Sequence, residues 1–260
     1  GRRPGRRPKA KPMTAAPATK LFVDALKSEG SRVRQLSNAR PLPDQMPRVY
    51  ANILDAVTLV LPEAARSWPA EVPGLEKLSA GLATILLRLQ RPEGHFPFPD
   101  LRGKNIRFGD LTEKQVHAGA VDVRDGWIVT PDPDGGSQFD TGLCGSALLA
   151  AGRQQRTAAW IQAGLRAADW ALSQPCCANF NYNAFSISLL AQAYRASGDA
   201  KYLDGALRKF RVGVAPGQAP NGRWLDPHNA RTVYHVIILR ALGDLAATLP
   251  ADRTVERAEL

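Results

Sequence analysis

Apolar side chains recur at the spacing of an amphipathic helix along most of the chain, beginning near residue 21. The first clear stripe consists of Met46, Val49, Tyr50, Ile53, Val57 and Val60. The second consists of Leu75, Leu78, Leu82, Ile85, Leu86 and Leu89. Because positions three and four residues apart share one helix face, each stripe predicts a helix with one buried side.

Residues 93–139 interrupt this pattern with many glycines and polar turns. The run Trp127-Ile128-Val129 is the only part that suggests a strand. A segment of this length with little regular structure inside a compact domain usually carries function. We therefore expect a long irregular loop here, and we interpret it as a binding loop.

Helical spacing returns after residue 140 and predicts pairs of helices with short connections. The expected helices cover about 141–153, 157–173, 182–197, 200–213 and 227–249. Leu148-Leu149-Ala150 recurs as Leu189-Leu190-Ala191, an offset of 41 residues. A repeat of this length built from helix pairs is typical of a solenoid or a closed ring.

These patterns together predict an all-α fold, in the form of an incomplete α/α toroid of sequential helical hairpins. The ring is favoured over an open solenoid because polar loops precede the first helix of each pair, as loops around one mouth would. We expect a single domain over residues 21–260 and a disordered basic tail over residues 1–20.

Charge and composition narrow the function classes. The net charge is +10, but the first twelve residues hold six basic and no acidic side chains, so the rest carries +4. A mildly basic body favours anionic partners such as acidic polysaccharides, while no recognisable motif predicts specific nucleic-acid binding. No apolar run is long enough to cross a bilayer, so we expect a soluble protein without membrane insertion.

Several kinds of chemistry lack a signal in the sequence. The cysteines Cys144, Cys176 and Cys177 are odd in number and predict buried free thiols rather than a disulfide framework. His228 and His235 are two helical turns apart, roughly 10 Å by helical rise, so they cannot share one metal ion directly. No nucleotide-binding fingerprint is present, and we expect neither a metal nor a cofactor.

Polar residues gather where three expected helices begin. These junctions are Gln138-Phe139-Asp140-Thr141-Gly142, Asn181-Tyr182-Asn183 and Trp224-Leu225-Asp226-Pro227-His228-Asn229-Ala230-Arg231. If the helices that follow line the inside of a ring, the junctions converge on one cavity. Alternative roles remain open, since Asp140, Asp226 and the two asparagines could only cap helices, and Tyr182 and Trp224 could belong to the core.

The last expected helix changes character along one face. Arg231, Tyr234 and His235 precede Ile238, Leu242 and Leu245 at helical spacing. The apolar half belongs in a core, whereas buried polar groups are costly without partners. We expect the polar half to enter a wet pocket, although His235 could also be a hydrogen-bonded packing residue.

The three junctions and the helix pairs between them resemble α/α-toroid carbohydrate-active proteins, a group that includes polysaccharide lyases and unsaturated uronyl hydrolases. The resemblance covers residues 136–250, and Arg91-Pro92-Glu93-Gly94-His95-Phe96-Pro97-Phe98 adds a loop of similar style. It implies β-elimination on an acidic polysaccharide, which points to a secreted or periplasmic location. The small number of expected helices favours an open cleft over an enclosed tunnel.

The resemblance assigns roles as follows. An amide or a cation neutralises the uronate carboxylate, and a Tyr or His removes the neighbouring proton. Neutralisation falls to Asn181, Asn183 or Arg231, and proton transfer to Tyr182, Tyr234, His228 or His235. The second hypothesis is a glycoside hydrolase with Asp140 and Asp226 as the carboxylate pair. The third is a non-catalytic carbohydrate-binding toroid. Further sugar contacts are expected from His95, Phe96, Phe98, Trp224 and Asn229.

Overall fold

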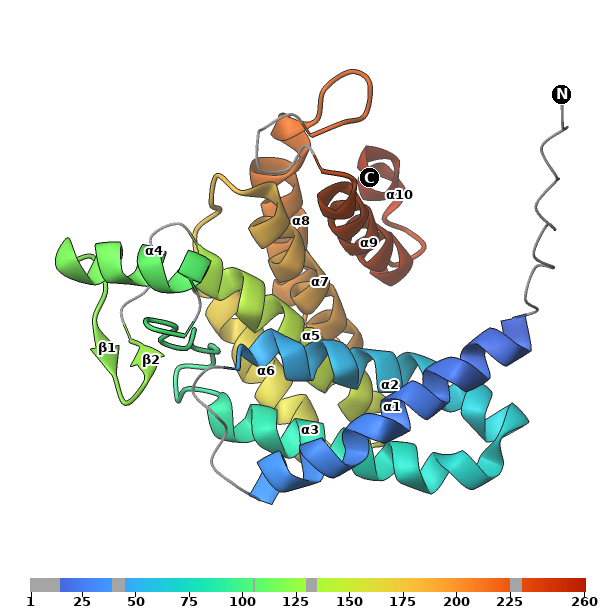
Figure 1. The fold of residues 1–260 in the computed structure, drawn as a ribbon. Coiled ribbons are helices and arrows are strands. Elements are labelled where there is room, and N and C mark those ends of the chain that lie inside the picture. The colour runs from blue at the N-terminus through green and yellow to red at the C-terminus, as the bar shows by residue number, and fades with distance from the viewer. Residues whose placement is uncertain (1–14, 39–44, 105, 130–134, 225–230) are drawn as a thin grey trace, which may run out of the picture.

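The computed structural model describes residues 15–38, 45–104, 106–129, 135–224 and 231–260 (Figure 1). Helices dominate this part of the chain, which confirms the predicted helical class. The first elements are α1 (Ala15–Asn38), α2 (Pro47–Ser67), the 3-10 helix η1 (Pro69–Glu71), α3 (Val72–Leu89), α4 (Ile106–His117), β1 (Val123–Arg124) and β2 (Trp127–Ile128). The others are α5 (Gly136–Gln154), α6 (Ala158–Ser173), α7 (Phe180–Ser197), α8 (Ala200–Gly213), the 3-10 helix η2 (Ala215–Gly217), α9 (Thr232–Thr248) and α10 (Thr254–Glu259).

Several predicted boundaries need correction. The helix expected from about residue 141 begins at Gly136, and the one expected from about residue 227 begins at Thr232. Residues 15–20 belong to α1 rather than to a tail, and residues 1–14 lie outside the described part. The segment 93–139 contains a regular helix, α4, which the glycine-rich sequence concealed. Position 109 of this helix requires glycine, because a Cβ there would lie 2.6 Å from the Leu101 carbonyl oxygen. The predicted strand at Trp127 is present as β2, paired antiparallel with β1 across an Asp125-Gly126 turn.

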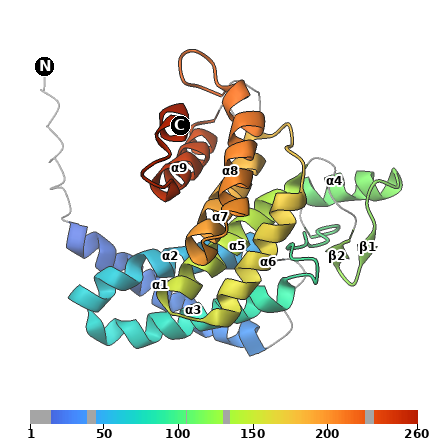
Figure 2. The ribbon, with the colours of Figure 1, turned by 180° about the vertical axis from the view of Figure 1, so that it is seen from behind.

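Helical hairpins form the body of the molecule. α2 packs on α3, α5 on α6, and α7 on α8, as the short connections predict. The first helices of these pairs also pack on one another, and α9 extends the series, in the order α2, α5, α7 and α9 (Figures 1 and 2). Asn179 caps α7 by accepting a hydrogen bond from the Asn181 amide, and Gly198 ends the helix in the left-handed region.

Close helix contacts depend on glycine. A Cβ on Gly142 of α5 would meet the backbone carbon and oxygen of Phe185 in α7 at 2.7 Å. A Cβ on Gly164 of α6 would meet the Leu149 side chain at 2.4 Å. Leu148, Leu149, Ile187, Leu189 and Leu190 are fully buried nearby. Each such large apolar side chain contributes roughly 1.5–3 kcal/mol on burial, so the small residues hold together a substantial core.

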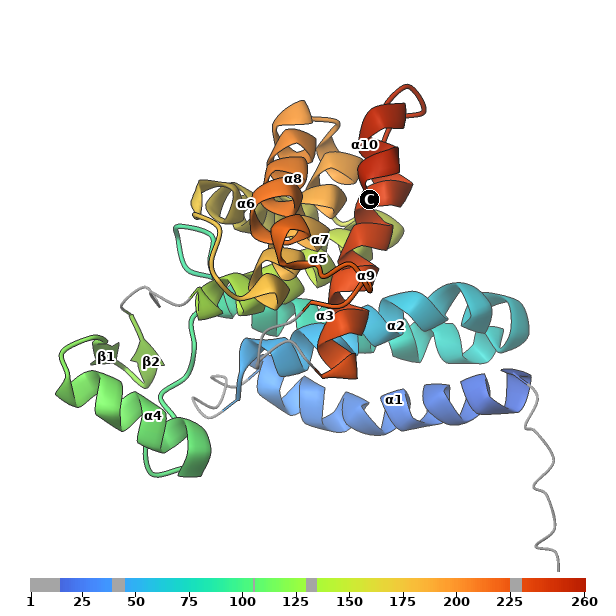
Figure 3. The same ribbon diagram turned by 90° about the horizontal axis from the view of Figure 1, so that it is seen from above.

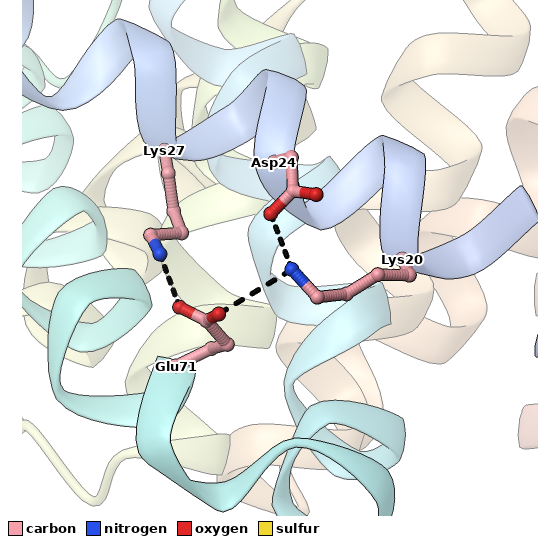
Figure 4. Close-up of polar contacts among 4 residues, drawn as sticks. All are labelled: Lys20, Asp24, Lys27 and Glu71. Carbon is pink, nitrogen blue, oxygen red and sulfur yellow. Dashed lines mark hydrogen bonds and ion pairs between the residues drawn. The ribbon is translucent and has the colours of Figure 1, made fainter. Parts of the chain in front are cut away.

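α1 lies along α2 and α3 (Figure 3) and packs mainly against α3. Its buried side includes Val23, Leu26 and Val33. At the junction with η1, the Glu71 carboxylate accepts hydrogen bonds from Lys27 and from Lys20, the latter at 3.4 Å (Figure 4). Lys20 also contacts Asp24 at 2.5 Å. Apolar burial and this charged group therefore fix α1 to the hairpin of α2 and α3.

Within the described residues, no helix combines the length and the apolar character that crossing a membrane requires.

Candidate functional site

The faces that α2, α5, α7 and α9 turn toward one another enclose a cavity of about 250 Å³, called here the four-helix hollow. From α5 it is lined by Phe139, Gly142, Leu143, Ser146, Ala147 and Ala150. These residues recur every three or four positions, so they form one face of the helix. Most of them are too small to fill the space between the helices, and a hollow remains.

The other three helices contribute residues at similar spacing. They are Ala51, Asn52 and Asp55 from α2, Ala184, Phe185, Ser188 and Gln192 from α7, and Ile237, Arg240, Ala241 and Asp244 from α9. Asp55 and Arg240 form an ion pair of 2.8 Å that joins α2 to α9. The hydrogen bond from Arg240 to Asp55 is the main cause that raises the pKa of Arg240. This ion pair connects α2 and α9, the first and last of the four helices in their packing order.

One end of the hollow lies beside a buried ion pair. Arg48, in the first turn of α2, donates from Nε to Oδ1 of Asp140 at 2.7 Å and from Nη2 to Oδ2 at 2.6 Å. The Asp140 side chain is 1% exposed and that of Arg48 is 21% exposed. Burial raises the pKa of Asp140, while the positive charge of Arg48 acts in the opposite direction. Two-point contact fixes the guanidinium in one orientation.

Aromatic rings surround this guanidinium. Its central carbon lies 3.9 Å from the ring centre of Phe139 and 5.6 Å from that of Phe98. Tyr182, at the start of α7, is nearly parallel to Phe139, with ring centres 6.0 Å apart. The guanidinium carbon of Arg48 therefore lies within about 10 Å of the Tyr182 ring centre. A cation, a phenol and two phenyl rings meet at the end of the hollow, an arrangement we call the Arg48 cluster.

The opposite part of the hollow is polar. Asp244 accepts a hydrogen bond from Ser188 Oγ at 2.8 Å. Gln192 accepts one from Arg153 at 3.4 Å. The Ser146 hydroxyl oxygen is buried and has no hydrogen-bond partner among the described residues. Buried polar atoms normally find partners, so this wall is suited to a ligand that carries hydrogen-bonding groups.

The predicted junctions converge only in part. Asp140 and Tyr182 both adjoin Phe139, as expected if the helix starts share a hollow. Asp140 is not an N-cap, because α5 begins at Gly136 and Asp140 lies in its second turn. Asp226, His228 and Asn229 lie outside the described residues, and their predicted roles stay predictions.

The predicted asparagines are buried at the start of α7. Asn183 donates to the backbone oxygens of Cys177 and Gly213, at 2.7 and 2.8 Å, and accepts from the Cys177 amide at 3.1 Å. These bonds use both ends of its side-chain amide, so Asn183 tethers the preceding loop rather than facing a ligand. Asn181 is 1% exposed and does not line the hollow.

Two aromatic residues expected to contact a sugar belong to the core. Phe96 is 0% exposed and Trp224 is 1% exposed. The indole nitrogen of Trp224 donates to the Val214 carbonyl at 2.9 Å, which satisfies its polar atom inside the protein. The expectation that both rings line a surface cleft is therefore corrected. Of Phe96, Phe98 and Trp224, only Phe98 belongs to the Arg48 cluster.

The remaining predicted residues lie on the rim or elsewhere. Arg231 is exposed at the start of α9, and Tyr234 follows it in the first turn. His235 packs against Trp224, with ring centres 5.7 Å apart. His95 packs against Trp170 of α6, with ring centres 5.4 Å apart, and burial lowers its pKa. Among the described residues these side chains do not line the four-helix hollow.

Sequence reasoning missed Arg48, Asp55, Arg240 and Asp244. Arg240 and Asp244 follow Ile237 at helical spacing on a second face of α9, and that spacing could have revealed them. Arg48 follows Pro47 at the start of the first stripe, but its partner lies 92 residues away. Only the packing of α2 on α5 brings them together.

A larger concavity of about 710 Å³ lies between α2, α3 and the turn that joins α5 to α6. Its charged lining residues are Glu76 and Arg156, and it contains none of the predicted site residues. The described residues include no cluster of three or more His, Cys, Asp or Glu side chains suited to hold a metal ion. The four-helix hollow therefore remains the stronger candidate.

Comparison with protein families, with curated proteins and with solved structures finds no match to this chain. The geometry of the hollow must therefore carry the functional argument by itself.

Proposed function

We propose that the protein is a polysaccharide lyase that cleaves a uronate-containing polymer by β-elimination at the Arg48 cluster. The observation that supports this most directly is the position of Arg48 and Tyr182 on the same Phe139 ring, beside the hollow. Elimination needs a cation at the uronate carboxylate and a base at the neighbouring carbon. Arg48 and Tyr182 supply these two groups beside one phenyl ring, with the guanidinium carbon within about 10 Å of the Tyr182 ring centre.

The reaction has three steps: binding of the carboxylate, removal of the C5 proton and departure of the leaving sugar. The Arg48 guanidinium binds the uronate carboxylate, which makes the C5 proton more acidic. The ionised oxygen of Tyr182 takes that proton, and the electron pair of the broken C5–H bond forms the C4–C5 double bond. The C4–O bond breaks, and the departing sugar oxygen receives a proton from the Tyr182 phenol. The products are an unsaturated uronate end and a new sugar hydroxyl.

Asp140 acts as the positioning residue for this step. Its two oxygens hold the Nε and Nη2 side of the guanidinium, which leaves the Nη1 side for the substrate. Phe98 and Phe139 cover the guanidinium and offer apolar faces for a sugar ring. In this proposal Arg48 takes the role of carboxylate neutraliser that was expected of Asn181, Asn183 or Arg231.

The same proposal includes the toroid. α2, α5, α7 and α9 are taken as the inner helices, and α3, α6 and α8 as the outer ones. The packing order of the inner helices supports this. So does the cavity that they share.

Hydrolysis is the second candidate because two carboxylates, Asp55 and Asp244, line the hollow. They replace the expected pair of Asp140 and Asp226, since Asp140 is 1% exposed with both oxygens bonded to Arg48, and Asp226 lies outside the described residues. In this mechanism one carboxyl group protonates the leaving oxygen and the other activates water or attacks the sugar. A non-catalytic carbohydrate-binding protein is the third outcome to test.

The test is incubation with alginate, polygalacturonate, glucuronan and unsulfated glycosaminoglycans. Ultraviolet absorbance of the conjugated double bond reports elimination, and new reducing ends without that absorbance report hydrolysis. We expect absorbance to rise with the native protein and to be lost in Tyr182→Phe and Arg48→Gln. Tyr194→Phe, a change of the same kind later in α7, is the matched control and retains activity. Absence of the unsaturated product from every polymer would rule out the lyase.

A further inference from the structure

The hollow carries three charged side chains, of which two are negative. These are Asp55, Asp244 and Arg240, and Arg240 is already paired with Asp55. A second uronate carboxylate placed in the hollow would lie beside two carboxylates and only one guanidinium, so it would add negative charge to a lining that is already negative overall. The electrostatics of the hollow therefore oppose an anionic sugar and accept a neutral one.

The polar groups of the hollow match sugar hydroxyls. A carboxylate has about four lone-pair sites, and the bonds from Ser188 to Asp244 and from Arg240 to Asp55 leave most of them open. The buried hydroxyl of Ser146 has no partner among the described residues. Acceptors on two helices and a hydroxyl on a third suit a ring with several hydroxyl groups.

The size and shape of the hollow agree with this. The hollow has a volume of about 250 Å³, which is below the range of roughly 300–1,000 Å³ typical of sites for drug-sized ligands. A ligand of the size of one sugar residue therefore suits it better than a larger molecule. Asp55 lies seven residues after Arg48 on α2, about 10 Å farther along the helix axis. One sugar therefore cannot touch Arg48 and Asp55 together, and two adjacent sugars are needed to occupy both places.

We propose that the four-helix hollow is a binding site for a neutral, hydroxyl-bearing sugar residue adjacent to the uronate held by Arg48. Asp55 and Asp244 accept hydrogen bonds from its hydroxyl groups, and the Ser146 hydroxyl makes a further hydrogen bond. This inference rests on the proposed function and narrows its substrate class. The preferred polymer alternates uronate with an uncharged sugar, and a polymer made only of uronates is a poor substrate.

The test compares two tetrasaccharides of equal length by calorimetry. One comes from hyaluronan, in which uronate alternates with a neutral acetylated amino sugar, and the other is tetragalacturonate, in which every residue is a uronate. Binding is measured with Tyr182→Phe protein so that neither ligand is consumed. We expect the hyaluronan tetrasaccharide to bind at least about tenfold more tightly, the effect of one charged hydrogen bond or more.

Three further changes locate the site. Asp244→Asn and Ala150→Leu, each added to Tyr182→Phe, should weaken binding of the hyaluronan tetrasaccharide about tenfold or more. The first removes a charged acceptor, and the second fills part of the hollow. Ala247→Leu is the matched control, because Ala247 is exposed on α9 and does not line the hollow.

Each result decides the proposal. Equal or tighter binding of tetragalacturonate would overturn it, as would failure of both ligands to bind, or equal weakening by Ala150→Leu and Ala247→Leu. The lyase assay is read separately on polymers with the native protein. An unsaturated product combined with a preference for tetragalacturonate leaves the lyase standing and removes the neutral-sugar site.

Discussion

The Arg48 guanidinium in α2 holds both carboxylate oxygens of Asp140 in α5, at 2.7 and 2.6 Å. Asp140 is buried and Arg48 is largely so, and removing one partner of a buried ion pair leaves an uncompensated charge. We expect Arg48→Met to lower the free energy of unfolding by about 3 kcal/mol, measured by urea denaturation. Arg48→Met combined with Asp140→Leu should recover most of that loss. If the double variant is no more stable than Arg48→Met, the ion pair is not the source of the effect.

The close contact of α5 and α7 provides a second prediction. A Cβ at Gly142 would lie 2.6 Å from the Phe185 Cβ and 2.7 Å from its backbone. Because a backbone cannot move aside cheaply, Gly142→Ala should lower the free energy of unfolding by about 1–3 kcal/mol. Thermal and urea unfolding measure the change.

Gly243→Ala is the matched control on α9. A Cβ there meets nothing within 4 Å, and the residue is exposed. Alanine has a higher helix propensity than glycine, so this change should raise the free energy of unfolding by roughly 0.5–1 kcal/mol. Equal effects of the two changes would mean that α5 and α7 are not in close contact at Gly142.

The sequence predicts local structure well and long-range pairing poorly. The stripes of α2, α3 and α5–α8 are visible because each helix buries one face, so their number and order follow from periodicity. α4 was missed because Gly109 interrupts its pattern, and the contact that requires this glycine involves Leu101, which precedes the helix.

The residues of the candidate site likewise fall into those that the local sequence revealed and those that depend on long-range packing. Asp140 and Tyr182 were found because polar residues at helix starts stand out in the chain. Phe96 and Trp224 were misassigned because the local sequence around an aromatic loop residue does not show whether its ring contacts a ligand or fills the core. Their burial depends on segments far away in sequence. Arg48 and Asp55 were missed because their partners lie 92 and 185 residues away.

A third prediction concerns Lys209, which is 0% exposed in α8. Its ammonium donates to Gln138 Oε1 and to the Gln174 carbonyl, each at 3.1 Å. Burial lowers its pKa, and its hydrogen bonds tie the loop before α7 to the start of α5. Lys209→Met should lower the free energy of unfolding by about 1–3 kcal/mol, since it removes the hydrogen bonds to Gln138 and Gln174 and leaves Gln138 Oε1 with only the bond from Ser186.

The same change should loosen the loop that leads to Tyr182. Amide hydrogen exchange over residues 174–183 should become faster in Lys209→Met, beyond what the loss of global stability explains. Lys77→Met serves as the control, because Lys77 is exposed on α3 and its removal should leave both quantities nearly unchanged. An unchanged exchange rate in Lys209→Met would contradict the tethering role.

The last prediction concerns the attachment of α1 and its dependence on pH. The hydrogen bond from Lys27 is the main cause that lowers the pKa of Glu71 below its ordinary value of 4.5, and Lys20 acts in the same direction. A carboxyl group with a lowered folded pKa stabilises the fold above its unfolded pKa. That contribution is lost as the pH falls through the folded pKa. Attachment of α1 should therefore weaken only in acid, below about pH 4.5.

Amide exchange of α1, corrected for intrinsic rates, measures this attachment. Glu71→Gln should show faster exchange in α1 at neutral pH and a smaller further change in acid than the native protein shows. The burial of Val23, Leu26 and Val33 still holds the helix in this variant, so partial opening rather than complete release is expected. Glu76→Gln, on the exposed side of α3, should behave like the native protein at both pH values. If Glu71→Gln leaves exchange in α1 unchanged at neutral pH, apolar packing alone attaches the helix.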